Sequence, residues 1–224
     1  MLTERHYPLY LTHYELDDYL ARGWYRMNQM IFTCHFIYFN EGIYSPVWIR
    51  LPLHNFSFKK RLKKIIRRNK QLFRIESRPA SITAEKERLY QLYRMNFNGQ
   101  LASSLRDAML DNTNINIYDT HEICIYHEDQ LVALSFFDKG AKAIASIKGI
   151  FHPAFAKYSL GFFTMLMEIE WARDNGKLFY YPGYVIPGRP RFDYKLRIGD
   201  VEYFNANDRL WESYERLQIN ELPI

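Results

Sequence analysis

Three strands in quick succession are predicted from residues 122–151, which read EICIYHEDQLVALSFFDKGAKAIASIKGIF. The runs 122–127, 131–138 and 143–151 are rich in β-branched and aromatic residues, and the polar turns 128–130 and 139–140 separate them. Connections this short favour an antiparallel meander. A long apolar helix is expected next, because Ser159 can cap its start and Gly176 can stop it after Asn175.

The elements on either side complete a recognisable order. Two helices are expected before the meander, at 84–97 and 101–110, and strands are expected after the long helix at 178–181 and 194–204. This order resembles that of a GNAT-type acyltransferase domain. It predicts an α+β fold with a mixed, mostly antiparallel sheet.

The first third of the chain has a different pattern. Residues 14–22 predict a short helix ended by Gly23, and 24–39 and 43–53 predict extended segments joined by a turn at 40–42. A helix is expected from Phe58. The pattern changes near Arg78-Pro79, so we expect a smaller α/β N-terminal segment at 1–78 and the transferase-like domain at 79–224.

Composition excludes several classes of protein. The 224 residues are 48% hydrophobic, 25% charged and 17% aromatic, which is typical of a globular chain. No apolar run approaches a membrane span, and residues 1–18 lack the apolar core of a signal peptide, which predicts a soluble, cytoplasmic protein with no membrane partner. Cys34 and Cys124 form no CxxC pair and the seven histidines are scattered, so neither a metal nor another cofactor is expected.

The net charge of +5 is concentrated in one segment. Residues 57–71 contain no acid and eight cations, namely Lys59, Lys60, Arg61, Lys63, Lys64, Arg67, Arg68 and Lys70. On a helix their side chains lie opposite an apolar stripe that includes Leu62 and Ile66. A face of one sign predicts a polyanionic partner, whereas a merely solvated face usually mixes signs.

The most distinctive motif is the run Tyr181-Pro182-Gly183-Tyr184-Val185-Ile186, followed by Arg191-Phe192-Asp193-Tyr194-Lys195. It resembles the Tyr-x-Gly-Tyr-x-Ile and Tyr-Lys signature of the aminoacyl-tRNA–protein transferases, the arginyl and bacterial leucyl enzymes. Similar elements occur in the same order at 20–26, 47–52, 67–69, 159–161 and 168–173. One departure is clear: where the family has a cysteine cluster, this chain has only Cys34.

The resemblance implies transfer of Arg or Leu from aminoacyl-tRNA to the N-terminal amine of a protein with an acidic first residue, as in N-degron tagging. It also implies roles for residues of the signature. Tyr181 and Tyr184 would line the pocket and donate hydrogen bonds, Tyr184 as a catalytic residue, and Gly183 would let the backbone approach closely. Arg191 and Lys195, beside Tyr194, would bind the acceptor carboxylate, although Lys195 pairing with Asp193 or Asp200 is the alternative.

Two further interactions are expected with the tRNA substrate. Lys60, Lys63, Lys64, Arg67 and Arg68 would contact tRNA phosphates. Ser159 and Gly161, at the start of the long helix, would bind an anion such as a phosphate or an oxyanion, with a simple N-cap as the alternative.

Glu170 is the predicted proton acceptor. On a helical wheel it projects between Phe163 and Leu166, inside the apolar arc, whereas Glu168 lies on the polar side. A desolvated carboxylate has a raised pKa, which suits proton transfer. An ion pair with Arg173 is the alternative for Glu170.

Two other functions fit the same fold. A coenzyme A-dependent N-acetyltransferase needs a glycine-rich pyrophosphate loop, and residues 153–161 contain one glycine. A catalytically silent tRNA-binding relative would keep the basic helix without transfer activity.

Overall fold

The computed structural model describes residues 3–39, 42–111 and 113–217, so the turn predicted at 40–42 lies partly outside the described residues. The elements in chain order are β1 (Thr3–His6), α1 (His13–Ala21), β2 (Tyr25–Met27), β3 (Met30–Cys34), β4 (Ile37–Phe39), β5 (Gly42–Tyr44), β6 (Val47–Pro52), α2 (Lys60–Leu72), β7 (Arg74–Pro79), α3 (Ala84–Met95), α4 (Leu105–Leu110), β8 (Thr120–His127), β9 (Gln130–Lys139), β10 (Ala143–Phe151), η1 (Pro153–Tyr158), α5 (Leu160–Asp174), β11 (Phe179–Val185), α6 (Pro190–Asp193), η2 (Tyr194–Ile198), β12 (Glu202–Asn205), β13 (Leu210–Ser213) and η3 (Tyr214–Arg216).

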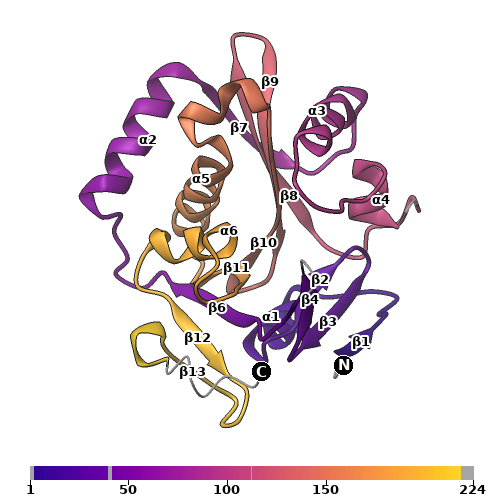
Figure 1. Cartoon of the computed structure of the whole chain (residues 1–224), viewed down its shortest axis with the longest axis vertical. Helices are drawn as coiled ribbons and strands as arrows, with labels where there is room; N and C mark the ends of the chain where they lie inside the picture. Colours follow the sequence, from indigo (N-terminus) through magenta and orange to yellow (C-terminus); the bar gives the residue numbers. More distant parts are fainter. Residues whose placement is uncertain (1–2, 40–41, 112, 218–224) are drawn as a thin grey trace.

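An eight-stranded sheet forms the centre of the molecule, in the order β13-β12-β6-β11-β10-β9-β8-β7 (Figure 1). Among the described strands of this sheet, β10 and β11 pair in parallel and the other pairs are antiparallel. The predicted meander is present as β8, β9 and β10. The fold is therefore the expected α+β arrangement with a mixed, mostly antiparallel sheet, and the meander, the long helix α5 and the parallel strand β11 follow in the order expected of a GNAT-like domain.

Helices cover both faces of this sheet. On one face α5 packs on β9 and β10 with α2 outside it, and on the other face lie α3 and α4 (Figure 1). Because α5 is covered by the sheet on one side and by α2 on another, most of its circumference is apolar and buried. Asn175 caps its C-terminal end, and Gly176 follows with φ of +65°, a conformation that glycine adopts without strain.

The N-terminal segment contains α1, a three-stranded sheet in the order β1-β3-β2, and the β4–β5 hairpin. It packs on the same face of the large sheet as Trp48 and Tyr181. The buried guanidinium of Arg26 fixes it there, donating to Asp138 (2.7 Å) and to the carbonyl of Met109 (2.7 Å). This face therefore places N-terminal side chains close to β10 and β11.

The boundary expected after residue 78 falls inside β7, and β6 lies in the interior of the large sheet between β11 and β12. One predicted strand was wrong. The strand expected at 194–204 begins only at Glu202, because 190–198 form α6 and η2. The edge strands β7 and β13 were not predicted. In the part of the chain described, no helix has the length and apolar character to span a bilayer.

Candidate active site at the fork between two parallel strands

Strands β10 and β11 separate partway along their length. Ala143–Ala145 pair with Phe179–Tyr181, and pairing between the two strands stops there. Both strands are irregular at this point: β10 has a register shift between Ser146 and Lys148, and β11 has one between Tyr180 and Gly183. Pro182 has no N–H to donate and Gly183 has φ of +91°, so β11 bends away from β10. We call this point the fork.

A cleft of about 570 Å³ opens at the fork. Its walls come from α3, β10, the start of α5, β11 and α6–η2. Six of the predicted site residues line it, namely Ser159, Gly161, Tyr184, Arg191, Tyr194 and Lys195. The structure thus brings together residues from two separate motifs, the signature and the start of the long helix.

The cleft is cationic. Lys148, Arg191 and Lys195 line it, and no Asp or Glu does so among the described residues. Desolvation lowers the pKa of Lys148 from its ordinary value and that of Lys195 to about 8. Two poorly hydrated ammonium groups without a lining carboxylate favour an anionic ligand.

Lys195 does not pair with either acid that we considered. Its Nζ atom donates to the carbonyl oxygen of Tyr184 (3.0 Å), while Asp200 pairs with Lys59 (2.6 Å). Arg191 lies at the rim, where it donates to the carbonyl of Asn98 and covers the ring of Phe97 at 4.3 Å. Lys195 therefore lies inside the cleft and does not form the surface ion pair that was the alternative.

Two tyrosines form part of the lining. Burial raises the pKa of Tyr184 above its ordinary value and that of Tyr194 to about 12. The ring of Tyr184 stacks on Phe192 at 5.7 Å and meets Trp48 edge to face at 5.4 Å. Both phenols therefore stay protonated near neutral pH and are hydrogen-bond donors.

Helix α5 begins at the cleft wall. Ser159 precedes it with φ of +54°, and its side chain makes no capping hydrogen bond, so the expected N-cap bond is absent. Ser159, Leu160 and Gly161 all line the cleft. The first N–H groups of a 15-residue helix and an uncommitted hydroxyl therefore face the space where a ligand would lie.

The predicted environments of the two α5 carboxylates are reversed. Glu170 is partly exposed and pairs with Lys70 of α2 (2.6 Å), outside the cleft. Glu168 is fully buried and accepts a hydrogen bond from Tyr180 Oη (2.7 Å). Burial raises the pKa of Glu168 to about 7, although the hydroxyls of Ser135, Tyr180 and Ser146 lower it. The helical wheel assigned these two carboxylates to the wrong sides because α5 is apolar around most of its circumference and has no distinct polar face.

Glu168 lies directly beneath the cleft. Ser135 and Ser146, whose hydroxyls help to lower the pKa of Glu168, both line the cleft. Ser135 Oγ and Glu168 Oε1 are buried without a hydrogen-bond partner among the described residues, so both can take part in a further hydrogen bond. A hydroxyl between the cleft and a carboxyl with a pKa near 7 provides a route for a proton. The sequence analysis did not assign a site role to Glu168, Ser135, Ser146 or Lys148. For Ser135 and Ser146, the alternation of side chains along a strand was the available signal, because it indicates which face of the sheet each residue lies on.

Tyr181 and Gly183 lie behind the cleft wall and do not line it. The hydroxyl of Tyr181 lies 3.5 Å from Arg50, and burial raises its pKa. A Cβ at Gly183 would lie 3.4 Å from Lys195 Nζ and 3.6 Å from the ring of Tyr25. Gly183 thus allows a close approach, as predicted, but the groups that approach its backbone are the side chains of Lys195 and Tyr25.

Tyr25 closes the fork from the N-terminal segment. Its hydroxyl contacts the carbonyl oxygens of Ser146 on β10 and Tyr181 on β11, the latter at 2.8 Å. These are the residues at which the two strands part. A side chain encoded far upstream therefore holds the strands in position at the cleft.

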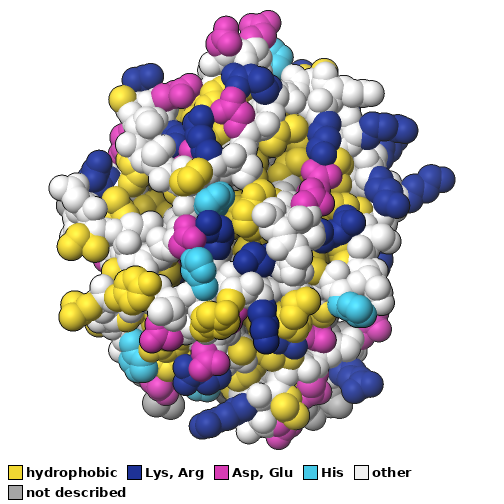
Figure 2. Space-filling model, turned by 180° about the vertical axis from the view of Figure 1, so that it is seen from behind, with side chains coloured by type: hydrophobic (Ala, Val, Ile, Leu, Met, Phe, Trp, Pro, Cys, Tyr) yellow, Lys and Arg dark blue, Asp and Glu magenta, His cyan; other side chains and the backbone are white. Residues whose placement is uncertain are grey.

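The cations predicted to bind tRNA cover the outer face of α2. Lys60, Lys63, Lys64, Arg67 and Arg68 are exposed, while Leu62 and Ile66 pack toward α5. Figure 2 shows Lys and Arg side chains projecting at its right edge, where α2 lies. Asn69, which is buried, donates to the carbonyl of Tyr158 (3.0 Å), so the end of α2 is tied to η1 and through it to Ser159.

Candidate metal ligands are dispersed over the part of the chain that the structure describes. Among the described residues, no three His, Cys, Asp or Glu side chains are grouped closely enough to hold an ion. Cys34 is buried, and desolvation raises the pKa of its thiol to about 11, which disfavours the thiolate that a metal requires.

The sequence is similar to those of several known proteins. The aspartate/glutamate leucyltransferase of Leptospira interrogans serovar copenhageni is 25% identical over 151 residues, which cover 65% of this chain and 58% of that protein. That of Helicobacter hepaticus is 25% identical over 206 residues, 87% of this chain and 83% of the relative. That of Phenylobacterium zucineum is 27% identical over 195 residues, which cover 82% of this chain and 74% of the relative.

Solved structures with other functions also align, at low similarity. FemX has a TM-score of 0.48 at 10% identity, over 79% of this chain and 61% of its own. The C-terminal domain of a lysylphosphatidylglycerol synthetase from Agrobacterium fabrum has a TM-score of 0.49 at 12% identity, over 68% and 50%.

The family model described as "Arginine-tRNA-protein transferase, C terminus" matches residues 85–205. This range includes α3, the meander, α5, the fork and α6–η2, which together form the cleft. Because the match covers more than half of the 224 residues, the chain belongs to the arginine-tRNA-protein transferase family.

Proposed function

We propose that this protein transfers an aminoacyl group from tRNA to the N-terminal amine of an acceptor protein whose first residue is acidic. The observation that carries the proposal is the continuity between the cationic face of α2 and the cationic cleft. Arg68 contacts the carbonyl of Lys157 in η1, and Ser159 follows at the cleft wall. A polyanion on α2 thus has a positively charged path to the fork.

The chemistry needs a proton acceptor but no protein nucleophile. The acceptor amine attacks the ester carbonyl of aminoacyl-tRNA, so that a C–N amide bond forms and the C–O ester bond breaks. One amine proton passes through the hydroxyl of Ser146 to Glu168, and the same proton is returned to the ribose oxygen of the tRNA as it leaves. We propose Glu168 as proton acceptor in place of Glu170, because Glu168 is buried beside the cleft and Glu170 is paired outside it.

The cations of the cleft fit the acceptor. An acidic first residue carries a side-chain carboxylate, and Lys148, Arg191 and Lys195 provide the opposite charge in a poorly hydrated space. We propose that Tyr184, as a protonated phenol, and the N–H groups at the start of α5 donate to an oxyanion at the ester carbon; both line the cleft, which supports this role. The predicted roles of Ser159, Gly161 and Tyr194 stay proposals of this kind.

We propose leucine as the transferred amino acid. The described residues that line the cleft include no carboxylate to pair with an arginine side chain, and they include apolar ones such as Phe151, Phe162 and Met165. The relatives compared above are named leucyltransferases. A leucyl side chain fits this lining, whereas an arginyl one would bring a fourth cation into it.

A coenzyme A-dependent acetyltransferase is the weaker candidate. The segment before α5, where a glycine-rich pyrophosphate loop would be needed, is the 3₁₀ helix η1, and only Gly161 follows it. A silent tRNA-binding relative would not need a buried carboxyl with a pKa near 7 below the cleft.

The decisive experiment uses purified protein with labelled Leu-tRNA or Arg-tRNA and peptides that begin with Asp, Glu, Arg or Lys. We expect a mass gain of one leucine on the Asp and Glu peptides only. Transfer from acetyl-coenzyme A would support the acetyltransferase. tRNA binding without any product would support the silent relative.

A further inference from the structure

Tyr25 reaches the fork from a strand that belongs to a different sheet. It lies on β2, which pairs with β3 in the N-terminal segment. Its ring is buried and stacks on Trp48, with 5.6 Å between the ring centroids. The next residue, Arg26, is fixed by its buried ion pair with Asp138. The backbone and the ring of Tyr25 are therefore both held, and its hydroxyl has a defined position.

The Tyr25 hydroxyl lies where the pairing of β10 with β11 ends. The last paired residues are Ala145 and Tyr181. The hydroxyl contacts the carbonyl oxygen of Tyr181, at 2.8 Å, and that of Ser146, the first residue of β10 beyond the paired stretch. A phenol has one proton to donate, so it bonds one carbonyl at a time. It links β10 to β11 beyond the point where their backbones pair.

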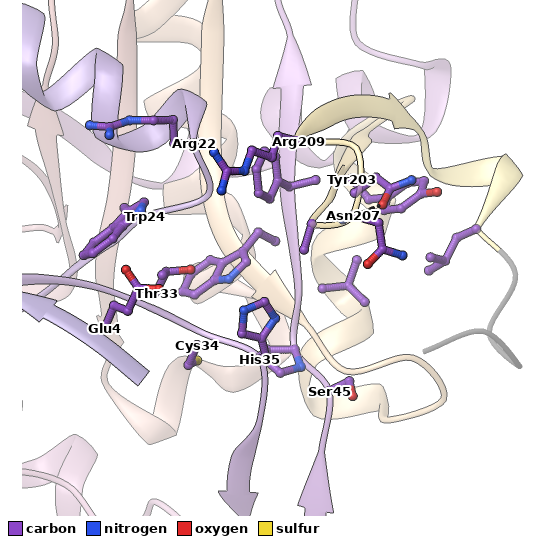
Figure 3. Close-up of a pocket in the computed structure, with 17 residues that line it drawn as sticks. Glu4, Arg22, Trp24, Thr33, Cys34, His35, Ser45, Tyr203, Asn207 and Arg209 are labelled. Atoms are coloured by element: carbon purple, nitrogen blue, oxygen red, sulfur yellow. Dashed lines mark hydrogen bonds between the residues drawn. The ribbon is translucent and has the colours of Figure 1, made fainter. Parts of the chain in front are cut away.

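Tyr25 lines neither of the two cavities near it. The described residues that line the cleft include Ser146 and Tyr184 but not Tyr25. A second pocket, of about 400 Å³, is lined by the neighbouring Trp24 and by Trp48 (Figure 3), and Tyr25 is again absent from the described lining. Any influence of Tyr25 on a reaction in the cleft therefore passes through the groups that it contacts.

Ser146 connects the fork to the buried carboxyl. Its hydroxyl helps to lower the pKa of Glu168, and it also lowers the pKa of Tyr180. Ser146 lies at an irregular point of β10, where the register against β9 shifts before Lys148. A hydroxyl relays a proton only when donor and acceptor are both within hydrogen-bond reach, so the position of its backbone matters. At Ser146 the phenol of Tyr25 contacts that backbone.

From these contacts we infer that Tyr25 is a positioning residue for transfer: its hydroxyl holds the carbonyls of Ser146 and Tyr181 at the fork and so aligns the Ser146 hydroxyl with Glu168. The inference rests on the proposed function, in which Ser146 passes a proton to Glu168. Tyr25 lies outside the residues 85–205 that the family model matches. The N-terminal segment thus has a part in the chemistry through one phenol.

The variant Tyr25→Phe tests this role. It removes the hydroxyl and keeps the ring that stacks on Trp48. With Leu-tRNA and a Glu-initiated peptide, kcat should fall about 10-fold, because Ser146 loses its alignment. KM for the peptide should stay within about 2-fold of wild type, since the cations of the cleft are unchanged. An unchanged kcat, or an effect on KM alone, would overturn the inference.

Tyr118→Phe is the matched control. Tyr118 is also a buried tyrosine that donates to a backbone carbonyl of the N-terminal segment, that of Met30, at 2.9 Å. Each variant loses one such hydrogen bond, so urea unfolding should show a similar loss of stability in both. Tyr118→Phe should nevertheless keep the wild-type kcat. An equal fall of kcat in both variants would mean that Tyr25 merely stabilises the N-terminal segment.

The pH profile gives a second readout. Glu168 interacts with hydroxyl groups from several elements, namely those of Tyr25 (β2), Ser135 (β9), Ser146 (β10), Tyr180 (β11) and Tyr194 (η2). Because the Ser146 hydroxyl lowers the pKa of Glu168, loss of its alignment should raise that pKa. The rate should therefore rise at a higher pH in Tyr25→Phe than in the wild type, and at the wild-type pH in Tyr118→Phe. An unchanged midpoint in Tyr25→Phe would contradict the inference.

Infrared spectroscopy follows Glu168 without turnover. The band of its protonated carboxyl, identified by its loss in Glu168→Gln, should disappear at a higher pH in Tyr25→Phe than in the wild type. If this shift occurs but the wild type transfers no amino acid, the proposed function fails while the positioning of Ser146 stands. If the wild type transfers leucine and Tyr25→Phe matches it in kcat and in the infrared midpoint, the proposed function stands and the inference fails.

Discussion

The outer face of α2 and the cleft are both cationic, but water reaches them differently. On α2 the Lys and Arg side chains from Lys60 to Arg68 are exposed. Among the described residues, acids pair with Lys59 before them and with Lys70 after them, but with none of the cations between. In the cleft Lys148 and Lys195 are poorly hydrated and have lowered pKa values. The exposed charges should therefore respond to salt, and the desolvated ones to pH.

The largest effect is expected beneath the cleft. Glu168→Gln keeps the size of the side chain and removes the proton acceptor, so the transfer rate should fall about 10²-fold. In the wild type the rate should rise as pH increases through about 7, where Glu168 loses its proton, and the variant should lack this rise. Single-turnover kinetics from pH 5.5 to 8.5 measure both.

Glu170→Gln is the matched control on the same helix. It loses an exposed ion pair with Lys70, which contributes little, so its rate should stay within a few-fold of wild type. If Glu170→Gln is the slower variant, Glu170 is the proton acceptor, as the sequence predicts.

Glu168 also affects stability. Its pKa is about 7 in the folded protein and near the ordinary 4.5 when unfolded, so the folded state favours the protonated form. The stabilisation is complete below pH 4.5 and is lost as pH rises toward 7, which amounts to about 2 kcal/mol between pH 5 and pH 8. Urea unfolding gives the free energy of unfolding of the wild type and of Glu168→Gln. The advantage of the wild type over the variant should decrease as pH rises from 5 to 8. Parallel pH profiles would mean that Glu168 ionises normally.

The cleft lysines should govern acceptor affinity. Lys148→Ala and Lys195→Ala should each raise KM for Asp- and Glu-initiated peptides about 10-fold, because each removes a charged hydrogen bond from a desolvated carboxylate. In the wild type this KM should rise above pH 8, where free Lys195 loses its proton. Lys63→Ala, on α2, is the control, and an equal effect from it would remove the distinction between the two regions.

The smallest and most salt-dependent effect belongs to α2. Replacing Arg67 and Arg68 by Glu should lower the slope of log affinity for tRNA against log salt by about 1.4 to 1.8, since each lost phosphate contact contributes about 0.7 to 0.9. Folding should survive because Leu62 and Ile66 are unchanged. An unchanged slope in a folded variant would place the tRNA elsewhere.

Features were predicted from the sequence where the residues that form them lie close together in the chain. The α2 face is contiguous in the chain, and the meander is local, so both were predicted. The cleft was predicted in part, because Tyr184, Arg191, Tyr194 and Lys195 lie in one motif. Lys148 was missed because its position depends on a bulge, and Glu168 because a helix buried nearly all round gives no direction to a helical wheel.

Strand β6 has a consequence for how the chain folds. It is synthesised early, yet both of its neighbours come late: Val47 pairs with Val185 of β11, and Ile49 with Tyr203 of β12 (Figure 1). Until residues 179–205 have left the ribosome, β6 therefore has two open edges and the large apolar side chains of Trp48 and Leu51 lack their final packing. Contacts between residues so distant in sequence slow folding, and an unpaired apolar strand is prone to associate with other chains. Chains that stop before β11 should accordingly aggregate or be degraded, and the reaction compartment forms only once synthesis is nearly finished.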